Sequence, residues 1–197
     1  MKYMGDYIPH IPDWFDARKA AQVTAFFADK AGGKINILRV TKLVYLADRL
    51  SMDRRECSIT GDNFVSMPFG PVNSNTYNYM KGKANNHMDD WREFIGAERF
   101  HRLPLAKQIE IHDLDELSRA EIKILEETWV TYKDVTDQFE LAEFTHKYCP
   151  EWRDPSGSSI PIDFATIYKK LEKIDPTELA EQHQADRALI SSLNGGE

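Results

Sequence analysis

The sequence predicts a mainly α-helical fold, a compact helical domain with one small β-hairpin. Apolar residues recur at helical spacing in several separate stretches, most densely from Val40 to Leu50. Helix-start signals precede these stretches, and the clearest is the capping box formed by Ser118 and Glu121. The stretch Ile59–Met67 instead alternates in the manner of strands. A chain of 197 residues fits one domain with short extensions.

The N-terminal part predicts an arm followed by a helix. Residues 1–12 are expected to be irregular, because two prolines interrupt any regular element there. Asp13 is expected to cap the first helix, with Asp16 in the first turn, where a carboxylate suits the helix dipole. Gly32-Gly33 is expected to end this helix. The chain is thus divided into an arm at 1–12, a helical domain at 13–175, and a C-terminal helix and tail at 176–197.

The next helix is the most apolar of the chain. Asn36 is expected to cap it, with Ile35 and Val40 packed together as a hydrophobic staple. A helix this apolar is normally covered on more than one side, so it should lie at the centre of the domain. Few positions remain for solvent, and these are Arg39, Lys42, Asp48 and Arg49.

The segment after this helix predicts the hairpin. Ile59–Met67 alternates about Gly61-Asp62, so one short strand is expected on either side of that turn. Gly70-Pro71 is expected to form a further turn, since glycine tolerates positive φ and proline fixes the next φ. Asn73 should then cap a short helix that ends at Gly82.

The rest of the chain predicts an extended segment and several helices. Pro104 restricts the extended segment, near Arg102–Ile111, to the edge of a sheet. Further helices are expected to start at Asp89 or Asp90, Ser118, Asp137, Asp163 and Asp175-Pro176. The helix after Asp137 is expected to bury Phe139, Leu141, Phe144 and Tyr148.

Composition and charge exclude several classes of protein. Hydrophobic residues make up 42% of the chain, which is enough for a core, and no run approaches the roughly 18 apolar residues of a membrane span. Two cysteines cannot form a disulfide framework, and the first ten residues lack the apolar part of a secretory signal. A cytoplasmic protein without a membrane partner is therefore expected. The net charge of −7 argues against nucleic acid as a partner and favours a basic protein.

No catalytic, cofactor or metal signature is present. His146 and Cys149 are half of a metal site at most, or a nucleophile with its base, but a packed histidine and a buried cysteine explain them better. Asp48 and Asp62 could be imagined as an acid–base pair. Asp62 is better explained by hydrogen bonding within a turn, and Asp48 by an ion pair with Arg49 or Arg39 at the surface or at an interface.

Several short motifs occur in an order that resembles the Panacea domain, the family of SocA-like antitoxins and phage-associated relatives. The first motif is Lys42–Asp48, which reads KLVYLAD, and Ile59–Asp62 follows it. The others are Gly70-Pro71-Val72 with Tyr77, Leu117-Ser118, Thr145-His146 and Pro150-Glu151-Trp152. The resemblance covers residues 24–171.

The resemblance implies a mostly helical fold and an antitoxin that binds and neutralises a toxin encoded beside it, without catalysis of its own. One alternative is a proteolytic adaptor that delivers the toxin to a cellular protease, and a less favoured one is an enzyme. Homo-oligomerisation stays open. The candidate partner-binding residues are Tyr45, Arg49, Asp62, Phe69, Tyr77 and Trp152.

Two of these candidates have a stated alternative. Phe69 lies between Pro68 and Pro71 in a stiff loop, and a stiff loop binds at low entropic cost. The interpretation favoured over this is that its ring fills the domain's own core. Trp152 is likewise either a core residue or a contact residue, because aromatic side chains are common in both places.

Overall fold

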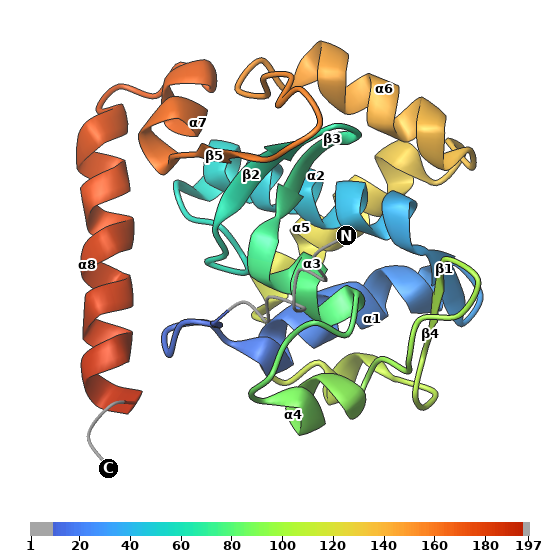
Figure 1. Cartoon of the computed structure of the whole chain (residues 1–197). Helices are drawn as coiled ribbons and strands as arrows, with labels where there is room; N and C mark the ends of the chain where they lie inside the picture. Colours follow the sequence, from blue (N-terminus) through green and yellow to red (C-terminus); the bar gives the residue numbers. More distant parts are fainter. Residues whose placement is uncertain (1–9, 195–197) are drawn as a thin grey trace, which may run out of the picture.

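The computed structural model describes residues 10–194 and confirms the mainly helical class with a minor β component (Figure 1). Most of the predicted arm at 1–12 and the end of the predicted tail, residues 195–197, lie outside the described part. The helices are α1 Ala17–Lys30, α2 Ile37–Arg55, α3 Ser74–Met80, α4 Met88–Arg92, α5 Arg119–Tyr132, α6 Gln138–Tyr148, α7 Phe164–Lys170 and α8 Pro176–Asn194, with a 3₁₀ turn at Ile111–Asp113. The strands are β1 Lys34–Asn36, β2 Phe64–Met67, β3 Gly70–Asn73, β4 Arg102–Pro104 and β5 Ile160–Ile162.

Helix α2 lies at the centre, as its composition predicts. It packs against α1, α5, α6 and β3, which surround it on different sides (Figure 1). The Asn36 side chain accepts hydrogen bonds from the backbone N–H of Leu38 and Arg39, so the predicted N-cap is confirmed. Most of the helix is buried up to Met52.

The hairpin is present, but its turn lies elsewhere in the sequence. Strands β2 and β3 pair antiparallel with Met67 opposite Gly70, so Pro68-Phe69 forms the turn. The prediction that Gly61-Asp62 is the hairpin turn is therefore wrong, and Gly70-Pro71 belongs to a strand. Strand β5 pairs with the other edge of β2, which gives the order β3-β2-β5.

A second small sheet joins β1 to β4, with Ile35 opposite Leu103. It confirms that the segment beginning at Arg102 is extended, although only three residues of it pair with β1. Leu103 is buried by this pairing, whereas Pro104 closes the strand.

Most predicted helix starts are confirmed and two are displaced. Ser118, Asp137 and Asp163 accept hydrogen bonds from the first turns of α5, α6 and α7. Asp16 rather than Asp13 caps α1, because its carboxylate accepts from the Lys19 N–H at 2.8 Å. Helix α4 begins after His87 instead of Asp89 or Asp90.

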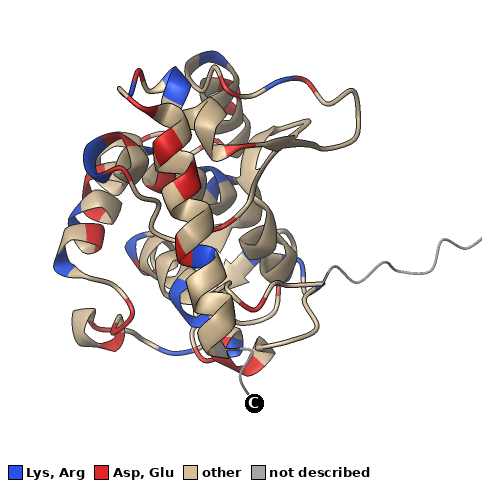
Figure 2. Cartoon of the chain, turned by 90° about the vertical axis from the view of Figure 1, so that its left-hand side faces the viewer, with Lys and Arg blue, Asp and Glu red and all other residues tan. Residues whose placement is uncertain are grey.

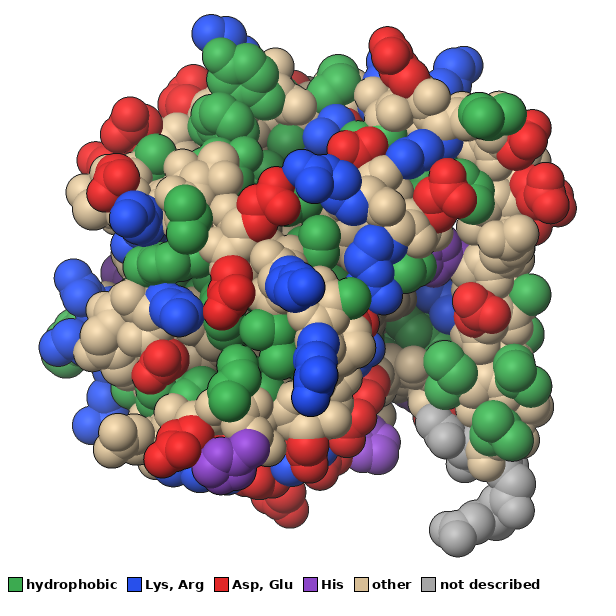
Figure 3. Space-filling model, turned by 180° about the vertical axis from the view of Figure 1, so that it is seen from behind, with side chains coloured by type: hydrophobic (Ala, Val, Ile, Leu, Met, Phe, Trp, Pro, Cys, Tyr) green, Lys and Arg blue, Asp and Glu red, His purple; other side chains and the backbone are tan. Residues whose placement is uncertain are grey.

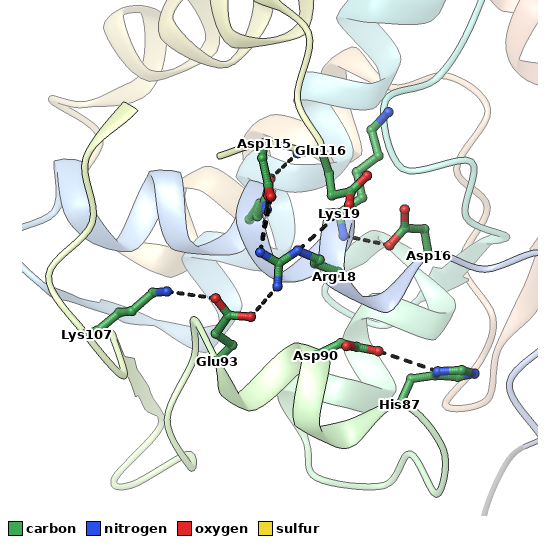
Figure 4. Close-up of polar contacts among 10 residues, drawn as sticks. Asp16, Arg18, Lys19, His87, Asp90, Glu93, Lys107, Asp115 and Glu116 are labelled. Atoms are coloured by element: carbon green, nitrogen blue, oxygen red, sulfur yellow. Dashed lines mark hydrogen bonds and ion pairs between the residues drawn. The ribbon is translucent and has the colours of Figure 1, made fainter. Parts of the chain in front are cut away.

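Ion pairs link α1, the end of α4 and the long segment between β4 and α5 (Figure 4). Arg18 contacts the carboxylates of Glu93 and Asp115, and Lys107 pairs with Glu93 at 2.8 Å. The Gln22 amide also donates to Asp115, at 2.5 Å. Pairs exposed to this degree contribute little stability each, so we assign them the role of fixing the path of the chain.

Helix α8 lies at one side of the molecule and packs mainly against α7 (Figure 1). Figure 2 shows it in front of the body, with Asp and Glu residues concentrated along its upper half. Across residues 10–194, no helix combines the length and the apolar character that crossing a membrane requires.

Candidate protein-binding surface

Asp48 anchors the irregular segment that precedes the hairpin. Its carboxylate is fully buried and accepts hydrogen bonds from the backbone N–H of Ile59 at 2.7 Å and of Thr60 at 3.0 Å. The Asn73 side-chain amide donates to the same group at 2.6 Å. Burial raises the pKa of Asp48, and these hydrogen bonds oppose the rise. The expected surface ion pair with Arg49 or Arg39 is therefore wrong.

Asp62 caps a helix from a distance. Its buried carboxylate accepts from the backbone N–H of Asn75 at 2.9 Å and of Thr76 at 2.8 Å, which are the first turn of α3. Asn73 stands at the N-cap position, but its side chain makes no capping hydrogen bond, because it is bound to Asp48. Burial raises the pKa of Asp62 to about 6.

Lys42, expected at the surface, lies in the core beneath β3. Its Nζ donates to the Pro71 carbonyl at 2.8 Å, and burial lowers its pKa to about 7. Gly70 is pressed against the same place with φ of +98°, and a Cβ there would overlap Thr145 Oγ1. The strand thus approaches α2 and α6 more closely than another residue type would allow.

Glu151 ties the segment after α6 to α2. It is 2% exposed and accepts from the Tyr45 hydroxyl at 2.5 Å and from Arg49 Nε at 2.7 Å. Burial, and secondarily the Glu151 charge, raise the pKa of Tyr45 well above its ordinary value. The backbone that leads to Trp152 is therefore fixed by a buried carboxylate with two donors.

These anchors present a small aromatic surface at the hairpin turn. The Phe69 ring is 56% exposed and lies edge-to-face with Phe139 of α6, which is 53% exposed, at 5.9 Å between centroids. Beside them Trp152 donates from Nε1 to the Met67 carbonyl at 2.9 Å and stacks on His146 at 4.0 Å. We call Phe69, Phe139, His146 and Trp152 the hairpin-tip patch.

The prediction that α6 buries Phe139 and Tyr148 is wrong. Helix α6 lies on the outside of the molecule and buries one face, which includes Leu141, Ala142 and Thr145. Phe139 therefore projects toward the hairpin turn, and Tyr148 is 50% exposed on the flank that faces α5, next to Phe144.

His146 and Cys149 are packed in place rather than assembled into a reactive pair. Burial raises the pKa of the Cys149 thiol to about 12, so the thiolate needed for nucleophilic attack is disfavoured. Burial also lowers the pKa of His146, although the charges of Glu143 and Asp154 oppose this. Among residues 10–194, no three His, Cys, Asp or Glu side chains come close enough together to hold a metal ion.

The sequence of this chain matches the family described as "Antitoxin SocA-like, Panacea domain" over residues 40–153, more than half of its length. The chain belongs to this family. Searches of the curated proteins and of the solved structures found no match. The Panacea-domain match runs from the first turns of α2 to the residue after Trp152. It therefore contains all four residues of the hairpin-tip patch and the side chains that anchor it.

The six candidate residues are not brought to one surface. Tyr45 and Asp62 are buried and hold other segments, so their side chains are not accessible to a partner. Arg49 is half-buried against Glu151, and Tyr77 lies on α3, beyond the end of the hairpin opposite its turn. Only the remaining two, Phe69 and Trp152, belong to the hairpin-tip patch.

Sequence reasoning missed three residues that make this Panacea-domain surface. Phe139 starts a helical stripe of apolar residues, so its spacing predicts a core position. Lys42 and Glu151 were not recognised as anchors, since a charged side chain in a sequence is normally at the surface. The signal for Lys42 is its place inside an otherwise apolar helix that has almost no exposed face.

Proposed function

We propose that this chain is an antitoxin that neutralises a toxin by binding it directly, with no chemical step of its own. The observation that carries the proposal is the Panacea-domain match, which covers the central helix, the hairpin and the Trp152 segment. What an antitoxin of this kind needs is a surface that keeps its shape and excludes water from the contact.

The packing of the hairpin supports this role. A surface that is already ordered loses little conformational entropy on binding, so more of the contact energy appears as affinity. Phe69 is carried by a two-residue turn, and the adjoining strand is held by Lys42 and by close contact at Gly70. Exposed aromatic side chains on such a support are typical anchors of protein interfaces.

The buried polar residues support a role without catalysis. Asp48 and Asp62 each have their carboxylate oxygens occupied by donors of the chain itself. Glu151 is likewise engaged by Tyr45 and Arg49. Groups committed in this way hold backbone segments and are not presented to a substrate.

The test is made with the neighbouring reading frame. Its product, expressed alone in a bacterial host, should arrest growth, and co-expression of this chain should restore growth. The two purified proteins should then form a stable complex. A neighbouring product that is harmless, or a toxic one that this chain neither binds nor neutralises, would overturn the proposal.

A protease-deficient host separates direct neutralisation from delivery to a protease. Direct binding predicts that growth is restored equally in that host and that the toxin persists in the complex. Rescue that occurs only with an active protease, together with a shortened toxin half-life, would support the adaptor alternative instead.

A further inference from the structure

We infer that the hairpin-tip patch is the surface that contacts the toxin, and that the toxin offers it an apolar pocket with a basic rim. This inference rests on the proposed function and adds to it the place and the chemistry of the contact. Its first support is the exposure of Phe69 and Phe139, two adjacent rings that are each more than half exposed. Neighbouring exposed aromatic rings are a common mark of an interaction site.

The second support is that contacts with the rest of the domain hold the patch in one conformation. The Trp152 indole is fixed by its hydrogen bond to the Met67 carbonyl, the last residue of β2. His146 stacks on Trp152, and its Nε2 is buried without a hydrogen-bond partner. A partner therefore meets a preformed surface.

The charges around the patch indicate the sign of the charge on the partner's contact surface. The exposed residues of α6 near Phe139 include Glu140 and Glu143, and Asp137 caps the same helix. Asp154 is close enough to influence His146. The nearby cations are Arg153 and Lys147, of which Lys147 lies over the Tyr148 ring. Four carboxylates against two cations favour a basic rim on the partner.

A rival apolar surface exists at the end of α8. Leu189, Ile190 and Leu193 are 60%, 41% and 73% exposed there. Figure 3 shows hydrophobic side chains gathered over this lower end of the helix. The helix is held mainly by α7 and lies beyond the residues of the family match. Substitutions at this surface serve as a control, because its apolar residues are exposed to a similar degree as Phe69 and Phe139.

The experiment measures the dissociation constant for the purified product of the neighbouring reading frame, using the full chain. Phe69→Glu with Phe139→Glu should weaken binding by about 30-fold or more, which is the effect of removing an interface hot spot. Leu189→Glu with Leu193→Glu should leave it within about twofold, since these exposed changes touch no proposed contact. Two controls show whether a variant that binds weakly is still folded. One is the milder substitution Phe69→Ala, and the other is a thermal melt of each variant.

A charge-reversed variant tests the predicted sign of the partner. Glu140→Lys with Glu143→Lys should slow association by about tenfold at low salt, and added salt should reduce the difference. Faster association would overturn the basic rim while leaving the aromatic contact in place.

The outcomes also separate this inference from the proposed function. If wild type and the Phe69→Glu, Phe139→Glu variant bind the toxin equally, the patch is not the contact surface, although the antitoxin function survives. If binding is lost only in the α8 variant, the contact lies on α8. If wild type does not bind or neutralise the toxin, both the function and the inference are overturned.

Discussion

The β2–β3 hairpin and helix α8 are both at the surface, but they are held in different ways. The hairpin is anchored by buried polar groups, with Lys42 on the Pro71 carbonyl and Asn73 on Asp48. Across residues 176–193, α8 buries only Ala180 and otherwise relies on half-buried side chains. The chief ones are His183, which stacks on Phe164, and Arg187, whose guanidinium lies over the same ring. Beyond Arg187, its apolar residues are largely exposed.

This difference teaches where the molecule can be expected to stay fixed and where it can open. A buried donor or acceptor that loses its partner costs about 1 to 3 kcal/mol, so each anchor of the hairpin resists local opening. A helix with few buried contacts opens at lower free energy than the rest of the domain. We therefore expect the hairpin to keep one shape and α8 to exchange more readily.

The largest expected effect comes from adding a methyl group under the hairpin. Gly70→Ala places a Cβ against Thr145 Oγ1 at φ of +98°, so we expect the free energy of unfolding to fall by about 3 kcal/mol. Chemical denaturation measures this change. Gly157→Ala is the control, because φ is also positive there but no atom lies within 4 Å, and it should cost about 1 kcal/mol. Equal costs would contradict close packing at Gly70.

The second prediction concerns the buried charge of Lys42. Its pKa is about 7 in the folded chain, against an ordinary value of 10.5, so above pH 7 the unfolded chain binds a proton that the folded chain lacks. The free energy of unfolding should therefore rise with pH in this window, by about 2 kcal/mol between pH 7 and about 8.5. Below pH 7 the buried Lys42 amine of the folded chain becomes protonated, so this gain in the free energy of unfolding is lost.

The measurement is the slope of stability against pH in wild type and in Lys42→Met. The variant should lack the rise, because it has no group to titrate at this position. The window stops before the ordinary pKa of cysteine, 9.0, because burial raises the pKa of Cys149 and opposes the trend above it. Identical slopes in the two proteins would mean that burial does not lower the pKa of Lys42.

The smallest effect is expected on α8. The Arg187 guanidinium lies over the rings of Trp14 and Phe164 and donates to the Gly61 carbonyl. Arg187→Ala should cost about 1 kcal/mol of stability. Hydrogen exchange should accelerate within α8 and stay unchanged in the hairpin. Faster exchange in both would show that the two regions open together.

Local signals predicted the helices well, because the interactions that start a helix lie within a few residues. Asn36, Ser118, Asp137 and Asp163 each accept from N–H groups two or three positions ahead, so their role can be read directly from the sequence. The apolar character of α2 likewise predicted its central place, because so few of its residues suit solvent.

The sequence did not reveal hydrogen bonds between residues far apart in the chain, which allow charged side chains to be buried. Asp48 can be buried only because Ile59, Thr60 and Asn73 supply donors from 11 to 25 positions away. The hairpin turn was misplaced for a related reason. The Ile59–Asp62 segment alternates like a strand, but its backbone N–H groups donate to side chains and not to a partner strand. Those of Ile59 and Thr60 donate to Asp48, and those of Gly61 and Asp62 to the hydroxyls of Ser58 and Thr60.

The surface was predictable only in part. Phe69 and Trp152 both lie in the hairpin-tip patch, and whether they contact a partner stays a prediction. Phe139 could not be foreseen as their neighbour, since helical spacing places it as readily on the buried face as on the exposed one. Its exposure follows from how α6 is oriented, which depends on β3 and α2.

The central claim is that residues within the Panacea-domain match hold the β2–β3 hairpin in place, and that the turn of this hairpin binds a toxin. Hydrogen–deuterium exchange of the full chain, with and without the product of the neighbouring reading frame, tests it most directly. We predict slower exchange in the complex at residues 67–70 and 138–147. Slower exchange confined to α8, with the hairpin turn and α6 unchanged, would contradict the claim.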